Sequence, residues 1–203
     1  MRRIICFLIV FIYLSSFLES KGIGLNFVVS GLGGANYFVR SGVSLSYTGW
    51  GESYGVEGEI QVIFKKENIG LGLSYGNIYE TAVAKNPYTN WVWTRGVIRS
   101  PLLLKLLLNP LGKINPWVGV GKDNFNITYV KRKIAVEMRD ITLEGTEIFQ
   151  IIDIGTNLHL WKSVLLSFEI RYGYNETNNT VKTTNFESWQ FLLKVSYRFE
   201  LSK

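Results

Sequence analysis

Side chains able to do chemistry are few in this chain, and their spacing limits what they can do. His159 is the only histidine, which excludes a metal site built from several histidines and leaves one base for activating a nucleophile. Glu57 and Glu59 are separated by one residue, so an extended strand would place both carboxylates on one face. Such a pair suits either acid–base chemistry or ion pairing. We favour ion pairing, because charges of both signs occupy the corresponding face of other segments.

The elements that position these charges show the two-residue period of β-strands. Residues 188–199 show it most fully, with large apolar side chains on one face and mostly polar ones, including Lys194 and Arg198, on the other. A segment of about 9 to 11 residues with this period and terminal aromatics is typical of a strand that crosses a membrane with one face in lipid. The apolar face comprises Trp189, Phe191, Leu193, Val195, Tyr197 and Phe199.

Seven earlier segments read as strands of the same kind, and together they predict an all-β fold, an antiparallel up-and-down eight-stranded barrel. Lys105 sets the register of one strand, in which leucines face lipid and Pro101 predicts a bulge or a missing ladder bond. In the segment 116–129, the apolar positions switch from even-numbered to odd-numbered residues between Val120 and Phe125. This switch predicts a bulge near residues 122–124. The seven segments are residues 39–48, 54–64, 69–79, 91–108, 116–129, 147–160 and 164–175.

The glycine-rich residues 22–34 allow three interpretations. They extend the first strand through a glycine bend, form a short periplasmic lead, or add a ninth pairing segment. A ninth strand would place the termini on opposite sides of the membrane, so we favour the first two.

Connection lengths orient the predicted barrel. Residues 65–68, 109–115 and 161–163 are short, whereas residues 80–90, 130–146 and 176–187 are long and polar. This alternation is typical of short periplasmic turns and longer external loops, with residues 48–53 as a short first external loop and Lys131-Arg132-Lys133 in a later one. Aromatic residues near the loop ends would form the outer interface girdle. They are Tyr47, Trp50, Tyr75, Trp91, Trp93, Tyr172, Tyr174 and Trp189.

The amino terminus reads as a secretory signal peptide over residues 1–20, followed by one barrel domain over residues 21–203. Arg2 and Arg3 precede an apolar run over residues 4–18. Removing the peptide also removes Cys6, the only cysteine, and lowers the formal charge from +6 to +5. The mature chain would have no thiol chemistry, and its mild, dispersed charge argues against nucleic-acid binding. Aromatic residues at 14% and a mean hydropathy of +0.12 suit lipid-facing strands.

The predicted interior carries charges of both signs. Because an eight-stranded barrel is only wide enough for side chains to fill, these charges are expected to pair within a plugged lumen. The ion-pair candidates are Glu57, Glu59, Arg99, Lys105, Asp153, Glu169, Arg171, Lys194 and Arg198, and His159 also faces inward.

These patterns resemble those of the small outer-membrane β-barrel proteins of Gram-negative-type bacteria, the group that includes opacity-type and OmpX-like barrels. The resemblance rests on the last strand, ending Tyr197-Arg198-Phe199, and on residues 100–121, where a strand, a periplasmic turn and a Pro-aromatic-Val-Gly strand start follow one another. It implies an outer-membrane location, contact with outer-membrane lipid, and recognition of Tyr197 and Phe199 by the barrel-assembly machinery. The group's chains usually stop at the terminal aromatic, whereas residues 200–203 follow Phe199 here.

The resemblance implies a monomeric, non-enzymatic protein without a cofactor, with a role in envelope structure or surface interaction through the external loops. A lipid-modifying hydrolase of the outer-membrane deacylase kind would need a His-x-Ser step near the external leaflet. This chain instead reads His159-Leu160-Trp161-Lys162-Ser163, beside a predicted periplasmic turn, so we interpret His159 as a lumen or interface residue. Two alternatives stay open, a narrow channel for small solutes or ions and a soluble lipid-binding barrel with its apolar faces turned inward.

Overall fold

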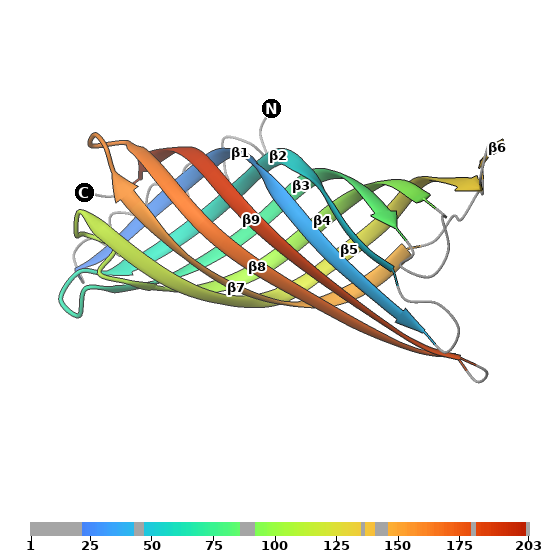
Figure 1. Ribbon diagram of the computed structural model, residues 1–203. Coiled ribbons are helices and arrows are strands. Elements are labelled where there is room, and N and C mark those ends of the chain that lie inside the picture. Colours follow the sequence, from blue (N-terminus) through green and yellow to red (C-terminus); the bar gives the residue numbers. More distant parts are fainter. Residues whose placement is uncertain are drawn as a thin grey trace, which may run out of the picture.

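Eight long antiparallel strands close into a barrel in the computed structural model (Figure 1), which describes residues 22–42, 47–85, 92–134, 137–140, 146–179 and 182–201. A short strand, β6 (Glu137–Asp140), pairs with the end of β5. No described segment is a helix long and apolar enough to span a membrane. The strands of the barrel are β1 (Ile23–Gly42), β2 (Tyr47–Phe64), β3 (Ile69–Lys85), β4 (Val92–Leu108), β5 (Ile114–Ile134), β7 (Thr146–His159), β8 (Val164–Asn179) and β9 (Lys182–Glu200).

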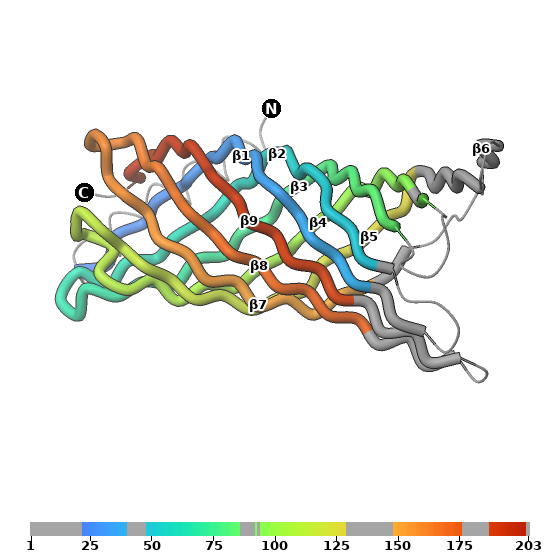
Figure 2. Tube along the Cα trace, viewed as in Figure 1, coloured from blue at the N-terminus to red at the C-terminus, as the bar shows by residue number. Residues whose placement is uncertain are grey.

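Each strand pairs with its neighbours along the chain, and pairing of β1 with β9 closes the barrel. A row of paired residues that starts at Phe27 returns to β1 at Tyr37, ten positions further along the strand. This stagger of ten residues over eight strands tilts the strands steeply against the barrel axis, as the tube trace shows (Figure 2). The row runs through Phe27, Ile60, Leu73, Leu104, Val120, Ile152, Tyr172, Trp189 and Tyr37.

The two ends of the barrel differ, and we name them the turn end and the loop end. At the turn end, on the left in Figure 1, the strands are joined by residues 65–68, 109–113 and 160–163. Asn68 and Asn109 adopt left-handed φ angles of 52° and 54° there, a conformation that asparagine tolerates better than most residues. The Asn68 amide donates to Asn109 Oδ1 at 2.6 Å, which ties two turns together. The short turns predicted from the sequence are therefore confirmed.

The first strand begins far earlier than predicted. Of residues 22–34, all but Gly22 lie in β1, which runs without interruption to Gly42, so they extend the first strand. The expected strand over residues 39–48 is wrong, and so is the external loop over residues 48–53, because β2 starts at Tyr47. Thr48 and Glu52 face outward and are exposed. Polar side chains on the outer face of a strand concealed the two-residue pattern of a lipid-facing strand.

The other strands also reach further toward the loop end than the sequence suggested. Expected loops over residues 80–90, 130–146 and 176–187 instead begin as strand, because β3 continues to Lys85, β5 to Ile134 and β8 to Asn179. The basic run Lys131-Arg132-Lys133 accordingly lies in β5 and not in a loop. The connections that follow β1, β3, β5 and β8 leave the same end of the barrel, as expected, but the long loop expected over residues 176–187 is wrong, because only residues 180–181 separate β8 from β9.

The predicted bulge near residues 122–124 is wrong. Inward and outward positions alternate without a break from Trp117 to Phe125, with Lys122 outward and Phe125 buried. The register shifts elsewhere, between Gly96 and Val97 of β4, which pair with Tyr129 and Ile127 of β5. The apparent change of pattern in the sequence has another cause. Beyond residue 121, β5 turns the polar side chains of Lys122 and Asn124 outward and Phe125 inward.

Pro101 interrupts the pairing of β3 with β4 without shifting its register. Pairs are present at Tyr75 with Leu102 and at Ile78 with Arg99, but not at the two positions between them. Proline has no amide hydrogen to donate. Gly76 faces the Pro101 ring, and a Cβ at Gly76 would lie only 3.4 Å from Pro101 Cγ. The missing ladder bonds that Pro101 predicted are confirmed.

The outer surface carries a continuous band of exposed apolar side chains next to the turn end, which we call the apolar belt. It ends toward the loop end at polar residues that face outward on five strands, Glu52, Asn77, Lys122, Gln150 and Glu187. A belt of this kind is the surface that outer-membrane barrels present to lipid. Its members include Val56, Ile60, Leu71, Leu73, Leu102, Leu104, Leu106, Val118, Val120, Ile152, Ile154, Phe168, Ile170, Leu193 and Val195.

Aromatic side chains lie where the apolar belt meets the polar surface. Tyr37 contacts Trp50 with ring centroids 4.9 Å apart, Tyr54 contacts Tyr79 at 5.2 Å, and Tyr172 contacts Trp189 at 4.6 Å. Tyr174 follows on the same outward face of β8. Rings at this level suit the interface between acyl chains and headgroups.

Of the other expected girdle residues, Tyr75 lies within the belt, because the strand turns polar only at Asn77. The side chains of Tyr47 and Trp93, and all of Trp91, lie outside the described residues, as does the predicted signal peptide. These expectations stay predictions.

Candidate functional site

The lumen contains most of the charged side chains that the sequence singled out. Inward positions of each strand alternate with outward ones, so a strand contributes one side chain to each successive layer of the interior. Along β4, from the turn end to the loop end, these side chains are Leu107, Lys105, Leu103, Pro101, Arg99, Val97 and Arg95, all buried. Apolar and charged layers therefore alternate along the axis.

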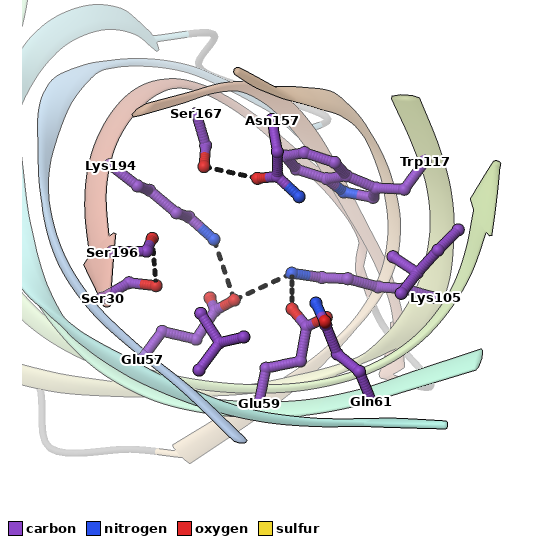
Figure 3. Close-up of a pocket in the computed structure, with 12 residues that line it drawn as sticks. Ser30, Glu57, Glu59, Gln61, Lys105, Trp117, Asn157, Ser167, Lys194 and Ser196 are labelled. Carbon is purple, nitrogen blue, oxygen red and sulfur yellow. Dashed lines mark hydrogen bonds and ion pairs between the residues drawn. The ribbon is translucent and has the colours of Figure 1, made fainter. Parts of the chain in front are cut away.

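Seven buried side chains form what we call the lower charged cluster, which is the set of charges nearer the turn end. Glu57 lies at its centre. Lys105 Nζ is 2.9 Å and Lys194 Nζ 2.8 Å from Glu57 Oε1 (Figure 3), and Arg171 Nη2 is 3.0 Å from Glu57 Oε2. One carboxylate thus contacts three cations from β4, β8 and β9. The members of the cluster are Glu57, Glu59, Lys105, Asp153, Glu169, Arg171 and Lys194.

The remaining carboxylates complete the lower charged cluster. Glu59 Oε2 lies 3.0 Å from Lys105 Nζ, and Glu59 Oε1 accepts a hydrogen bond from Gln61 at 2.7 Å. Glu169 contacts both Arg171 and Lys194. Asp153 Oδ2 is 4.0 Å from both Lys105 Nζ and Arg171 Nη2. Because these groups are withdrawn from water, an unpaired charge among them would be costly, and each cation is stabilised by the carboxylates that it contacts.

A second set of buried charges, the upper charged cluster, lies nearer the loop end and is centred on Arg99. The Arg99 guanidinium pairs with Asp123, and its Nη1 donates to Glu80 Oε2 at 3.0 Å and to Ser188 Oγ at 2.9 Å. Arg95 Nη2 lies 3.5 Å from Glu80 Oε1. The sequence identified Arg99 as an ion-pair candidate but missed Glu80 and Asp123, because these were assigned to a loop and to a bulge.

Apolar layers separate and cap the two clusters. Leu32, Ile78 and Leu192 pack together between them. Beyond the upper cluster, Phe38, Phe125, Phe149 and smaller apolar residues form what we call the aromatic plug. The Arg95 guanidinium lies 3.9 Å from the centroid of the Phe38 ring and 5.0 Å from that of Phe125, a cation–π geometry. The plug thus fills the lumen with apolar side chains near Asn124 and Asn126, which face outward.

Little space remains in the lower part of the lumen. A cavity of about 10 Å³ is lined by the charged side chains of Glu57, Glu59, Lys105 and Lys194, and by the Ser30 and Ser196 hydroxyls, which are 2.7 Å apart. That volume admits about one water molecule. Among the described residues no group of acids, histidine or cysteine is arranged to hold a metal ion. The geometry suits mutual neutralisation and support of the barrel wall.

Two of the predicted inward residues lie at the turn end, apart from both clusters. Arg198 Nη2 donates to Glu200 Oε1 at 3.1 Å and to the Lys162 carbonyl oxygen at 3.2 Å. His159 Nε2 lies 2.9 Å from Asn115 Nδ2 and 3.5 Å from Arg198 Nη1. His159 is thus a hydrogen-bonded residue at the mouth of the barrel.

The two aromatic residues expected to mark the chain for assembly lie side by side on the outer face of β9. Tyr197 and Phe199 are both exposed, with ring centroids 4.7 Å apart, and Phe199 stacks on Phe27 of β1. Their surroundings are those of the other outward apolar residues at the turn-end edge of the apolar belt.

Comparison with known proteins identifies the fold of the chain but assigns it to no sequence family. No protein-family model matches the chain, and no curated protein is similar to it in sequence. Among solved structures, the outer membrane protein OprG from Pseudomonas aeruginosa matches with a TM-score of 0.53 and 13% identity, over 87% of this chain and 96% of that one. Ail, the attachment invasion locus protein of Yersinia pestis, matches with a TM-score of 0.50 and 8% identity, over 87% and 99%. The chain has the fold of the small eight-stranded outer-membrane barrels.

Proposed function

We propose that this chain is a non-enzymatic integral protein of a bacterial outer membrane, whose barrel is a rigid support for the segments at its loop end. The apolar belt enters lipid, and the turn end faces the periplasm. The loop end projects from the cell and contributes to envelope structure or to contact with molecules outside. The fold shared with OprG and Ail supports this placement.

A reversal of polarity along the barrel axis carries the proposal. At the level of Leu104 and Val120 the outer face is apolar, and the lumen holds the lower charged cluster. Nearer the loop end, around Asn124 and Asn126, the outer face gains polar residues, and the aromatic plug fills the lumen beyond the upper charged cluster. The first arrangement is stable in lipid and the second in water. One molecule with both arrangements suits a barrel that crosses a membrane and extends beyond it.

The polarity of the two faces also decides between the alternatives. A soluble lipid-binding barrel requires apolar side chains inward and polar ones outward along its whole length, and the lower half of this barrel has the opposite arrangement. A channel requires a continuous aqueous path, whereas the lower lumen retains room for about one water molecule. We therefore favour the filled support over both.

Biogenesis and assembly state belong to the same proposal. Tyr197 and Phe199 on β9 would be the residues that the barrel-assembly machinery reads, and the barrel would function as a monomer, since β1 and β9 of one chain pair directly and close it. Outer-membrane lipid is then the partner that surrounds the whole belt.

Membrane fractionation combined with gel electrophoresis tests the proposal. We expect the protein in the outer-membrane fraction, and we expect its gel mobility to change on boiling, because a closed barrel resists detergent until it is heated. Protease added to intact cells should cleave within residues 141–145 or 180–181, between the strands of the loop end. A protein that stayed soluble without detergent and showed no heat-dependent shift would exclude the proposal.

Planar-bilayer recordings address the channel alternative. A filled lumen predicts no reproducible conductance steps. Regular steps from the folded protein would show that the ion-paired interior opens, and the chain would then be a channel.

A further inference from the structure

A second pocket lies at the turn end, outside the charged clusters of the lumen. It has a volume of about 360 Å³, and its walls are the turn between β7 and β8 and the last residues of β9. Trp161 and Leu160 contribute exposed apolar surface, with Trp161 76% exposed. Lys162, Arg198 and His159 contribute nitrogen atoms. The pocket thus combines an aromatic anchor with cationic side chains.

The hydrogen bonds at this pocket leave it rich in donors. The Arg198 guanidinium can only donate, so His159 Nε2, which is 3.5 Å from Arg198 Nη1, acts as the acceptor. A neutral His159 then carries its proton on Nδ1. Glu200 is the acidic residue of the pocket, 45% exposed at its side chain, and it engages Arg198. The two positive charges of Lys162 and Arg198 exceed the single negative charge of Glu200, so the pocket has a net charge of +1.

The location of the pocket points to a lipid headgroup. Leu160 and Trp161 lie just beyond Val164, where the outward apolar residues of β8 begin, so they mark the lower edge of the apolar belt. Tryptophan and lysine at such an edge are the residues that contact headgroups. Each of the three turns also carries lysine, at Lys65 and Lys66, at Lys113, and at Lys162. The turn end therefore presents positive charge at the level where phosphate groups lie.

We propose that this pocket binds the phosphate headgroup of a phospholipid in the leaflet adjacent to the turn end, with Lys162 and Arg198 contacting the phosphodiester oxygens. Trp161 and Leu160 contact the glycerol and the first acyl carbons. Arg198 is held in place by Glu200 and by the Lys162 carbonyl oxygen, whereas the Lys162 ammonium supplies the excess charge. The inference rests on the proposed function, because it requires the turn end to lie at a membrane surface.

Native mass spectrometry of the detergent-folded full chain tests the pocket. Three probes separate the contribution of the phosphate from that of the acyl chains. They are phosphatidylglycerol, a diacylglycerol with the same acyl chains, and inorganic phosphate. We expect the barrel to retain one phosphatidylglycerol, in preference to both other probes. Lys162→Ala should weaken that binding roughly tenfold, since one charge-assisted contact is lost, and Arg198→Gln should weaken it as well. Lys66→Ala, on a turn outside the pocket, is the matched control and should bind as the wild type does.

If Lys162→Ala and Lys66→Ala weakened phosphatidylglycerol binding equally, general surface charge would explain the binding, and the proposed pocket would be wrong. Equal retention of diacylglycerol would show that only apolar contact matters, and equal retention of inorganic phosphate would show a phosphate site that is not specific for lipid. The heat-dependent gel shift of the same samples separates the two proposals. A barrel that shows the shift but no headgroup preference excludes the pocket alone, whereas absence of the shift excludes the membrane barrel.

Discussion

Glu57 contacts more cations than any other carboxylate of the two charged clusters. Its two oxygens contact Lys105, Lys194 and Arg171, and it is 3% exposed. Glu59, two residues away on the same strand, has Lys105 as its cationic partner. The two glutamates that the sequence presented as a pair therefore have unequal importance for stability.

We expect Glu57→Gln to destabilise the barrel by about 3 to 5 kcal/mol, because it leaves buried cations without their shared carboxylate. Glu59→Gln is the matched control and should cost clearly less. Urea unfolding of the detergent-folded protein, followed by tryptophan fluorescence, measures both. Equal losses of unfolding free energy would contradict a network centred on Glu57.

At the residue scale the sequence predicted which charges face inward better than which charges meet. Strand parity alone places Glu57, Lys105, Glu169 and Lys194 in the lumen. The alternation of faces along a strand does not reveal the stagger between strands. It is the stagger that brings Lys194 next to Glu57, 137 residues away in the sequence. The upper charged cluster was missed for a related reason, because Glu80 and Asp123 lie on segments whose strand pattern the exposed polar residues obscured.

Inward glycines determine how closely large side chains pack against neighbouring strands. A Cβ at Gly155 of β7 would overlap the Trp117 ring and would lie 2.6 Å from the Phe168 carbonyl oxygen. Gly31 of β1 faces outward, and no atom lies within 4 Å of its corresponding position. The two glycines thus have opposite tolerance for a side chain.

We expect Gly155→Ala to destabilise the barrel by about 1 to 3 kcal/mol through overpacking against Trp117. Gly31→Ala should change the unfolding free energy little. The same urea titration in detergent measures both variants. A Gly155→Ala protein as stable as the wild type would show that the strands can separate to accommodate the methyl group.

The strands themselves change character along their length, and β5 shows this within a few residues. Val118 and Val120 face outward in the apolar belt, whereas Lys122, Asn124 and Asn126 face outward beyond it. Sequence periodicity identified the belt portion of each strand, because alternation of apolar and polar residues is visible there. Beyond the belt both faces depart from that pattern, so the strand ends were mistaken for loops.

We expect Val118→Arg to cost about 2 to 4 kcal/mol in folding into lipid vesicles, the penalty for arginine near the middle of a lipid-facing belt. Asn124→Arg, six residues further along the same face of β5, should cost close to nothing. Equilibrium folding in vesicles, read by gel shift, compares them. Similar costs at both positions would show that the belt does not end where the outward residues become polar.

The whole molecule consists of a turn-end half, with the apolar belt around an ion-paired lumen, and a loop-end half, with the upper charged cluster and the aromatic plug in its lumen. The sequence predicted the barrel and the end at which its short turns lie, because strand period and turn length are local features. It did not predict the polarity reversal, since β1 from Ile23 and the strand ends near Lys85 and Ile134 were not recognised as strand.

Cysteine labelling in intact cells tests the central claim, a barrel whose belt lies in the outer membrane with its loop end outside. Single cysteines replace Asn126, Val118 and Lys66, in a chain whose one native cysteine lies in the predicted signal peptide. A membrane-impermeant maleimide should label Asn126→Cys on intact cells and Lys66→Cys only after the outer membrane is opened. It should label Val118→Cys only after detergent and denaturant are added. Labelling of Val118→Cys or Lys66→Cys on intact cells would contradict the account.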